Sequence, residues 1–130
     1  MSAAQPKVHY QVLPLPRVQR EARKLLSTSQ LREAIRLAKR LRYYPEVSDL
    51  SLEPCGLGFE LRLEHPQIGQ QGWLRAILWI HDQGKTIYVV DLFWKKTNRI
   101  STADQERSNH RIRQLKQQLA AGGNPWKASE

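Results

Sequence analysis

The chain has 130 residues, 40% of them hydrophobic, which corresponds to one domain large enough to bury a core. It holds a single cysteine, Cys55, so an internal disulfide is excluded and no metal-ligand spacing is present. There is no run of about 18 apolar residues and no apolar stretch typical of a secretory signal near Met1, so we expect a cytoplasmic protein without a membrane span.

The positive charge of the chain is large and unevenly distributed. The net charge is +9 and the pI is near 10.1. Residues 1–44 contain ten Lys or Arg and two Glu, a net of +8, whereas residues 45–101 contain six basic and seven acidic residues, a net of −1. An excess of this size attracts polyanions, so nucleic acid and an acidic protein partner are both candidate ligands.

The N-terminal third predicts a strand followed by two helices. Residues 8–13 alternate as a short strand does, and apolar residues at helical spacing then predict a helix over 16–26, opened by Pro16. A second helix follows the hydroxyl residues 27–29 and ends near Tyr44, which precedes a proline. The outer surface of this helical hairpin is expected to be basic, either as a solvated face or as a surface for phosphates or an acidic partner. Its basic residues are Arg17, Arg20, Arg23, Lys24, Arg32, Arg36, Lys39, Arg40 and Arg42.

The middle of the chain predicts three consecutive strands. After a loop or short edge strand over 46–55, runs rich in β-branched and aromatic residues cover 59–64, 73–80 and 86–94. The last two are separated by a short polar loop containing Gly84, where we expect a positive φ, and therefore predict a β-hairpin. Consecutive strands of this kind favour antiparallel pairing.

A third helix is predicted after the strands. Thr102 and Gln105 have the spacing of a capping box, and Gly122 follows the last helical residue as a positive-φ cap does. The element order is therefore β-α-α-β-β-β-α, which predicts a single α+β domain over 1–130 with a sheet of about four antiparallel strands and the helical hairpin packed on one face. Residues 1–6 and 123–130 are expected to be tails, with Trp126 as a candidate lid or core plug.

Catalytic motifs with carboxylate pairs, glycine-rich loops or clustered metal ligands are not found, and the candidate site rests on cations within strands. Arg62 alternates with apolar residues and so faces away from the side that they bury. Arg75 lies among apolar neighbours, where a guanidinium must either reach a groove or form an ion pair. The candidate partners of such a pair are Glu60, Glu64 and Asp91. Lys95 and Lys96 alternate, so only one of them shares the face of Asp91.

Several of these residues occur in motifs that are similar to those of a known family. Gly56, Phe59, Glu60, Leu61 and Arg62 form the first motif, Trp73-Leu74-Arg75 opens the next strand, and 90–99 reads VDLFWKKTNR before a polar helix. In this order and spacing they resemble the RelE/HigB-type toxins of bacterial type II toxin–antitoxin pairs, especially the branch called phage-derived Gp49-like. The resemblance covers about residues 55–112, and the strand and two helices that precede it are also the family's order.

The resemblance implies a RelE/ParE-like fold and a metal-independent ribonuclease that cuts mRNA in the ribosomal A site, needs no cofactor, and is masked by an acidic antitoxin. Catalysis would rest on fixed cations that stabilise the developing charge on phosphorus. By residue match, Arg62 and Arg75 would contact the phosphate, and Lys95, with Lys96 second, would be the general acid or base. The RNA-binding residues implied by position are Arg99, Arg107, His110 and Arg111.

The chain departs from the family pattern in ways that leave a second interpretation open. Trp73-Leu74 stands where a tyrosine usually precedes the second arginine, Trp94 follows Phe93, and no titratable aromatic residue matches near the C-terminus. The alternative is a non-enzymatic toxin of the same fold, such as a gyrase inhibitor, or an inactive relative that only binds RNA or protein. A generic basic RNA-binding domain with strand tryptophans as stacking platforms is the third hypothesis.

Overall fold

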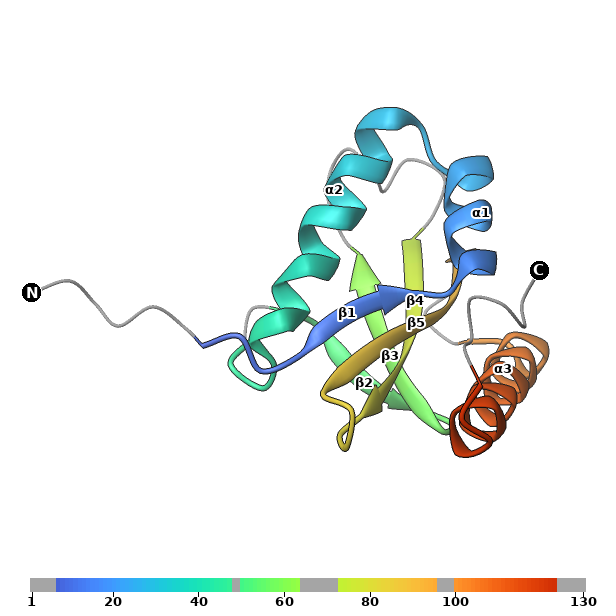
Figure 1. Cartoon of the computed structure of the whole chain (residues 1–130). Helices are drawn as coiled ribbons and strands as arrows, with labels where there is room; N and C mark the ends of the chain where they lie inside the picture. Colours follow the sequence, from blue (N-terminus) through green and yellow to red (C-terminus); the bar gives the residue numbers. More distant parts are fainter. Residues whose placement is uncertain (1–6, 48–49, 64–72, 96–99, 124–130) are drawn as a thin grey trace, which may run out of the picture.

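The computed structural model describes residues 7–47, 50–63, 73–95 and 100–123. Its elements in chain order are β1 (Gln11–Pro14), α1 (Pro16–Leu25), α2 (Thr28–Lys39), the 3-10 helix η1 (Arg40–Tyr43), β2 (Leu52–Cys55), β3 (Gly58–Leu63), β4 (Trp73–His81), β5 (Thr86–Lys95) and α3 (Thr102–Ala120). Figure 1 shows the sheet at the centre, with the hairpin of α1 and α2 on one side and α3 on the other. The α+β class and the element order are confirmed, with one additional strand.

The sheet has five strands in the order β1-β5-β4-β3-β2 and is mixed rather than antiparallel. Neighbours from β2 to β5 pair antiparallel, whereas β1 pairs parallel with β5, with Gln11 opposite Thr86. The prediction of about four strands is confirmed with one strand more, at the place where a short edge strand was left open, and the prediction of purely antiparallel pairing was wrong for β1. The extra strand, β2, pairs with β3 through a tight turn in which Gly56 has φ +55° and the amide of Leu57 donates to Asn109 Oδ1.

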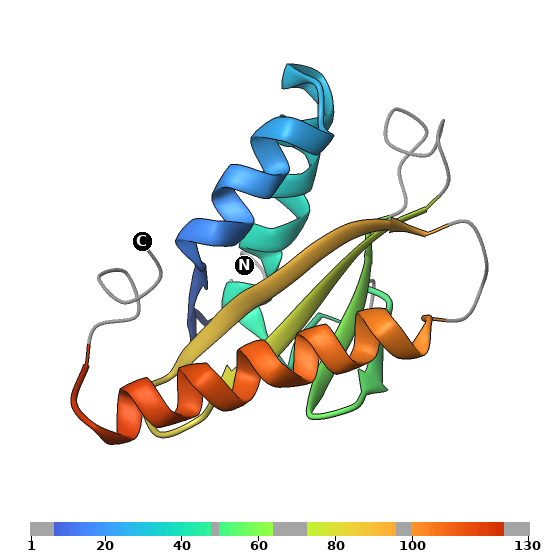
Figure 2. The same cartoon turned by 90° about the vertical axis from the view of Figure 1, so that its right-hand side faces the viewer.

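Each face of the sheet buries its own core. Leu61, Leu78 and Val89 pack under the helical hairpin with Val18 and Leu41, and all five are less than 9% exposed. The opposite face packs under α3, whose Ile112 and Leu115 meet residues of β4 and β5. Figure 2 shows α3 lying across this second face. Because strand residues alternate between faces, every residue of β3, β4 and β5 belongs either to the hairpin side or to the α3 side.

The helix ends follow from local hydrogen bonds. Ser27 caps α2 through a full capping box with Gln30, as the hydroxyl cluster predicted. The box predicted for Thr102 was wrong, because the preceding Ser101 is the N-cap and accepts from the amide of Asp104. After α3, Gly122 has φ +75°, which confirms the glycine cap.

Other sequence expectations have mixed outcomes. In the β4–β5 turn the positive φ belongs to Lys85, at +47°, and not to Gly84. No helix in the described part of the chain is long and apolar enough to cross a membrane. Of the expected tails, residues 1–6 and 124–130, including Trp126, lie outside the described residues, and Gly123 is described.

Candidate functional site

A ladder of charged side chains crosses the α3 face of the sheet. Its first pair joins Glu53 of β2 to Arg62 of β3, with Oε1 and Nη2 3.4 Å apart. Arg75 of β4, directly opposite Arg62 in the register, places its Nε 2.7 Å from Oε1 of Glu60. Lys95 of β5 places Nζ 3.5 Å from the same oxygen. The sheet therefore brings three cations onto one face, where Glu60 lies between Arg75 and Lys95 and Glu53 pairs with Arg62.

Burial differs sharply along this ladder. Arg75 is 1% exposed and Lys95 is 5% exposed, with Glu60 at 6%, whereas the side chain of Arg62 is 29% exposed. The ion pair with Glu60, one of the two alternatives for Arg75, is the arrangement found. Neither Arg75 nor Lys95 is therefore exposed to solvent, and of the three cations only Arg62 is partly accessible. A buried cation is tolerated only with a counter-charge, and here one carboxylate serves two cations.

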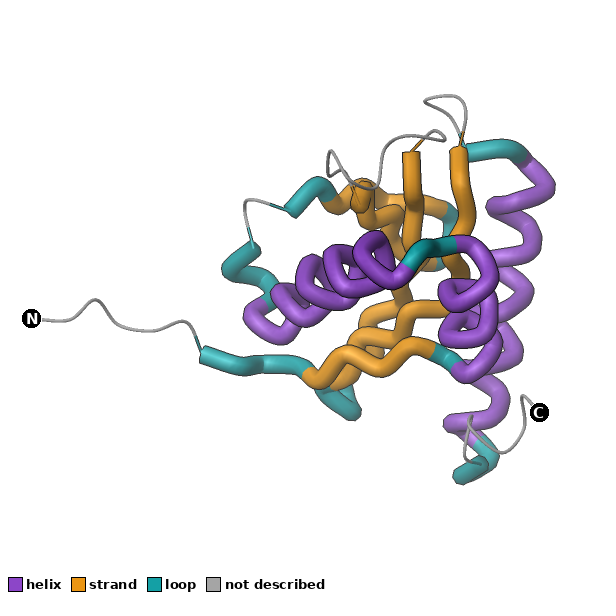
Figure 3. Tube along the Cα trace, turned by 90° about the horizontal axis from the view of Figure 1, so that it is seen from above, coloured by secondary structure: helices purple, strands orange, loops and turns teal. Residues whose placement is uncertain are grey.

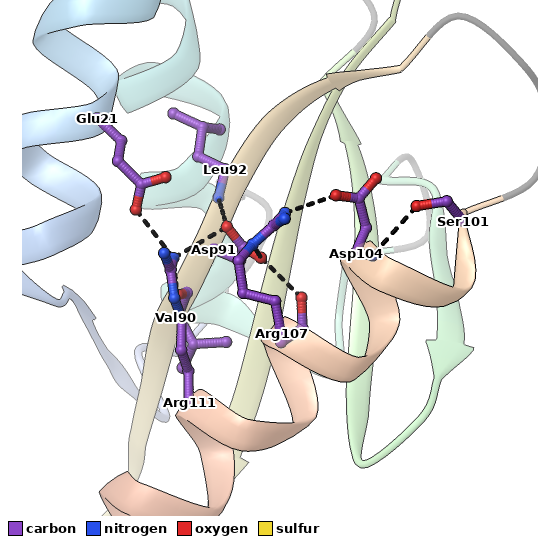
Figure 4. Close-up of polar contacts among 9 residues, drawn as sticks. Glu21, Val90, Asp91, Leu92, Ser101, Asp104, Arg107 and Arg111 are labelled. Carbon is purple, nitrogen blue, oxygen red and sulfur yellow. Dashed lines mark hydrogen bonds and ion pairs between the residues drawn. The ribbon is translucent and has the colours of Figure 1, made fainter.

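A second cluster lies where α3 crosses β5, and its centre is Asp91 (Figure 4). Asp91 is 0% exposed, and its two oxygens accept from Arg111 Nη1 at 2.9 Å, Arg107 Nε at 3.0 Å and Ser108 Oγ at 2.8 Å. Arg111 also donates to Glu21 of α1 at 2.9 Å. The cluster thus connects α3, β5 and α1, and it holds the polar first half of α3 where apolar contacts are few.

Three of the predicted RNA-binding residues lie on α3 within the described part of the chain, and they differ in exposure. Arg111 is 9% exposed and engaged by Asp91 and Glu21, so it is not available to a phosphate here. Arg107 keeps a 38% exposed side chain and stacks over Phe93, its guanidinium carbon 5.4 Å from the ring centroid. His110 is exposed on the outer side of α3. Lys96 and Arg99 lie outside the described residues.

Charges within the two clusters are balanced. The cations that take part in the two clusters are Arg62, Arg75, Lys95, Arg107 and Arg111, and the carboxylates that pair with them are Glu21, Glu53, Glu60, Asp91 and Asp104. All nine basic residues of the helical hairpin are instead exposed, as the sequence predicted. The excess positive charge of the molecule is therefore concentrated on the hairpin and not at the predicted catalytic residues.

Two carboxylates organise the site, and sequence reasoning considered them only as ion-pair partners. Glu60 and Asp91 each stand inside an apolar strand and face the α3 side, Glu60 by alternation and Asp91 at a β-bulge where Val90 faces the same side. A carboxylate at such a position is a signal for a buried cation partner. Near Glu60, burial raises the pKa of the Cys55 thiol, and the charge of Glu60 raises it further. Within the described residues no three His, Cys, Asp or Glu side chains are grouped so that they could hold a metal ion.

The fold is one that a solved toxin structure also has. A mutant of the E. coli toxin RelE in the free state matches with a TM-score of 0.56 and 13% identity, over 80% of this chain and 98% of that one. The archaeal RelE–RelB complex from Pyrococcus horikoshii matches with a TM-score of 0.47 and 21% identity, over 71% of this chain and 99% of that one. No protein-family model and no curated protein sequence matches the chain. The chain therefore has the RelE-type toxin fold.

Proposed function

We propose that the protein is the toxin of a type II toxin–antitoxin pair and that it is a ribosome-dependent mRNA endonuclease. The observation that carries the proposal is the convergence of Arg62, Arg75 and Lys95 from three adjacent strands onto one face of this fold. The net charge of +9 supports an RNA target and an acidic antitoxin, since both are polyanionic.

The proposed reaction needs no bound metal. The 2′-hydroxyl of the RNA attacks the adjacent phosphorus and gives its proton to a base, while the bond from phosphorus to the 5′ oxygen breaks and that oxygen takes a proton from an acid. The products are a 2′,3′-cyclic phosphate and a 5′-hydroxyl end. Arg62 and Arg75 are assigned to the phosphate and Lys95 to proton transfer, with Lys96 as its alternative. RNA contacts are assigned to Arg99, Arg107, His110 and Arg111.

Glu60 sets a requirement on this mechanism. Because Arg75 and Lys95 both face its carboxylate, the RNA phosphate has to replace Glu60 as their counter-ion before either cation can act. Fixed cations that need little rearrangement give the largest stabilisation of a developing charge. Of the three cations, Arg62 is the most accessible to RNA, because its side chain is 29% exposed and its ion pair with Glu53 is long, at 3.4 Å.

The test is induced expression in a bacterial host, with growth followed and mRNA ends mapped by primer extension. We expect growth arrest and cuts in the ribosomal A site that leave 5′-hydroxyl ends. Arg62→Ala should reduce cleavage on the order of 100-fold. Arg113→Ala, which removes the same charge from an exposed position of α3, should leave cleavage unchanged. Absence of cuts while growth is arrested would contradict the endonuclease assignment but not the toxin assignment.

The second candidate is a non-enzymatic toxin of the same fold, and one observation favours it. Both Arg75 and Lys95 are buried against Glu60, which is the arrangement of a structural ion cluster. Under this alternative, Arg62→Ala would leave growth arrest intact and no RNA ends would accumulate. The same expression experiment therefore separates the two candidates.

A further inference from the structure

Three aromatic side chains stack on the α3 side of the sheet, next to the turn that joins β4 to β5. Trp79 of β4 lies directly opposite Tyr88 of β5 in the register, and their ring centroids are 6.0 Å apart with an angle of 18° between the ring planes. His81, two residues after Trp79 and therefore on the same face, stacks on it with the centroids 5.1 Å apart and an angle of 30°. We refer to these three rings as the aromatic platform. In Figure 2 the second half of α3 lies beside this turn, and Figure 3 shows α3 running alongside the strands.

One end of the aromatic platform is open to solvent. Trp79 contacts both other rings and is the middle of the stack, Tyr88 is its buried end at 6% exposure, and His81 is its half-buried outer end. A Cβ at position 84 would lie 2.6 Å from Cδ2 of His81, so Gly84 leaves this side of the imidazole uncovered. The exposed Lys116 of α3 places Nζ 5.6 Å from the centroid of the Trp79 ring. The platform therefore offers a partly accessible ring with an ammonium group beside it.

The surroundings of the platform are positively charged. Residues 107–120 of α3 contain four Arg or Lys residues and no carboxylate. In the adjoining turn, the carboxylate of Asp82 accepts from the hydroxyl of Tyr10 and pairs with Lys85, so it is already engaged. A ligand that combines flat rings with negative charge matches this arrangement.

We propose that the aromatic platform binds an unpaired base of single-stranded RNA, which extends the stack at His81, and that Lys116 contacts an adjoining phosphate. Proteins hold unpaired bases by stacking them on aromatic side chains, histidine among them, and they track the backbone with cations. A base within a duplex has both of its faces covered, so the ligand is a single strand. The inference rests on the proposed function only in naming RNA as the nucleic acid.

The platform lies on the same face of the sheet as the cations of the candidate site. Arg75 and Trp79 are four residues apart on β4 and both face the α3 side, which corresponds to about 13 Å along the strand. One RNA strand can span this distance and contact both places. The platform then contributes to the affinity for RNA and fixes one base, whereas bond breaking takes place at the cations.

The binding test uses purified protein and two labelled oligonucleotides of about ten nucleotides, followed by fluorescence anisotropy. The first is oligoadenylate with 2′-methoxy groups, which cannot be cleaved by attack of a 2′-hydroxyl. The second has the same sugars and phosphates but carries no bases, so that stacking is the difference between the two. We expect the protein to bind oligoadenylate about tenfold more tightly than the base-free chain, a preference that one stacked base provides. Equal affinities would overturn the proposal.

Four variants assign this preference to the platform. His81→Ala should remove the preference for bases, and His81→Phe, which keeps a ring, should restore it. Lys116→Gln should weaken both oligonucleotides equally, because it removes a phosphate contact and leaves the rings in place. Tyr43→Ala removes a half-buried aromatic ring from η1 and is the matched control, so it should keep the preference of the parent. A preference that persists in His81→Ala would mean that the rings only fasten α3 to the sheet and that the proposal is wrong.

NMR of the unmodified protein gives a readout that does not depend on how stable a variant is. Oligoadenylate should shift the imidazole C–H signals of His81 and the indole N–H signal of Trp79. The indole N–H of Trp94, which donates to the carbonyl of Leu25 at 3.4 Å, should stay in place. A shift at Trp94 without one at Trp79 or His81 would place the RNA elsewhere and overturn the proposal. Because the ligand cannot be cleaved, a failure of RNA cleavage or of growth arrest in cells would not affect these measurements.

Discussion

Replacing Asp91 tests whether buried charges hold α3 on the sheet. The carboxylate accepts from Arg107, Ser108, Arg111 and the amide of Leu92, all within 3.0 Å, and it has no solvent exposure. Asp91→Ala removes the acceptor of these four donors. The buried guanidinium of Arg111 then keeps only the carboxylate of Glu21 among its two ion-pair partners in the cluster. Removing one partner of a buried ion pair costs about 3–5 kcal/mol. Domains of this size are stable by about 5–15 kcal/mol, so a large share of the folding free energy is at stake.

The measurement is urea unfolding followed by circular dichroism, with the midpoint and the slope fitted separately. We expect Asp91→Ala to lower the free energy of unfolding by that amount with an unchanged slope. Asp91→Asn keeps the shape and one acceptor oxygen but loses the charge, so its cost should be smaller, about 1–3 kcal/mol.

Arg107→Ala is the matched control, since it removes another member of the same cluster from an accessible position. Its side chain is 38% exposed, and Asp91 keeps Ser108 and Arg111 as donors when Arg107 is removed, so the cost should be smaller, about 1–2 kcal/mol. If Asp91→Ala costs no more than Arg107→Ala, burial of charge does not fasten α3, and the reasoning fails.

Three further predictions follow from the fold. Gly58→Ala should lower the free energy of unfolding by about 2–3 kcal/mol in thermal unfolding, because the added Cβ would lie 2.2 Å from the carbonyl oxygen of Leu78. A smaller loss would show that β3 and β4 can move apart. The hydroxyl of Tyr10 donates a 2.6 Å hydrogen bond to Asp82, and this bond raises the pKa of Tyr10 from 10.0 to about 12. The contribution of the bond to folding stability is therefore complete below about pH 10 and is lost as the pH rises through about 12. Tyr10→Phe should remove about 1 kcal/mol at pH 8 and flatten the alkaline loss, and an unchanged alkaline profile would contradict the assignment. Burial raises the pKa of Cys55, so its alkylation by iodoacetamide at pH 7.5 should be much slower in the folded protein than in urea, and equal rates would refute this.

Sequence periodicity found every helix and the three long strands, because each of these elements carries its own apolar pattern. It left β2 undecided because this strand is four residues long and contains Pro54, so it has too few residues to show alternation. The parallel pairing of β1 with β5 joins residues more than 70 positions apart, for example Gln11 and Thr86, and no local pattern records it. The error at the start of α3 is one residue, because Ser101 and Thr102 are adjacent hydroxyl residues and both suit an N-cap.

The candidate site was predictable in part for the same physical reasons. Alternation places Arg62 and Arg75 on one face, and the register confirms that they are directly opposite. Whether a cation on that face is exposed depends on where α3 lies, which is a property of tertiary packing. The sequence left open both an ion pair and a groove for Arg75. Glu60, two residues before Arg62 on the same face of β3, forms the ion pair with Arg75 in the structure.

The distribution of charge leads to a last prediction about how a partner would affect RNA binding. The two ion clusters are balanced, so the field that attracts RNA comes mainly from exposed cations, nine of which lie on the hairpin. An acidic partner that covers the hairpin would neutralise part of that field without touching Arg62 or Arg75. RNA affinity should therefore fall when polyglutamate, a simple acidic chain, is bound, and the dependence of log K on log salt should become less steep, because fewer counter-ions are released. Fluorescence anisotropy of a labelled RNA oligonucleotide, with and without saturating polyglutamate at about 50 to 200 mM salt, measures both quantities. Equal affinities and equal slopes would mean that RNA approaches another face and that the charge of the hairpin serves only the protein partner.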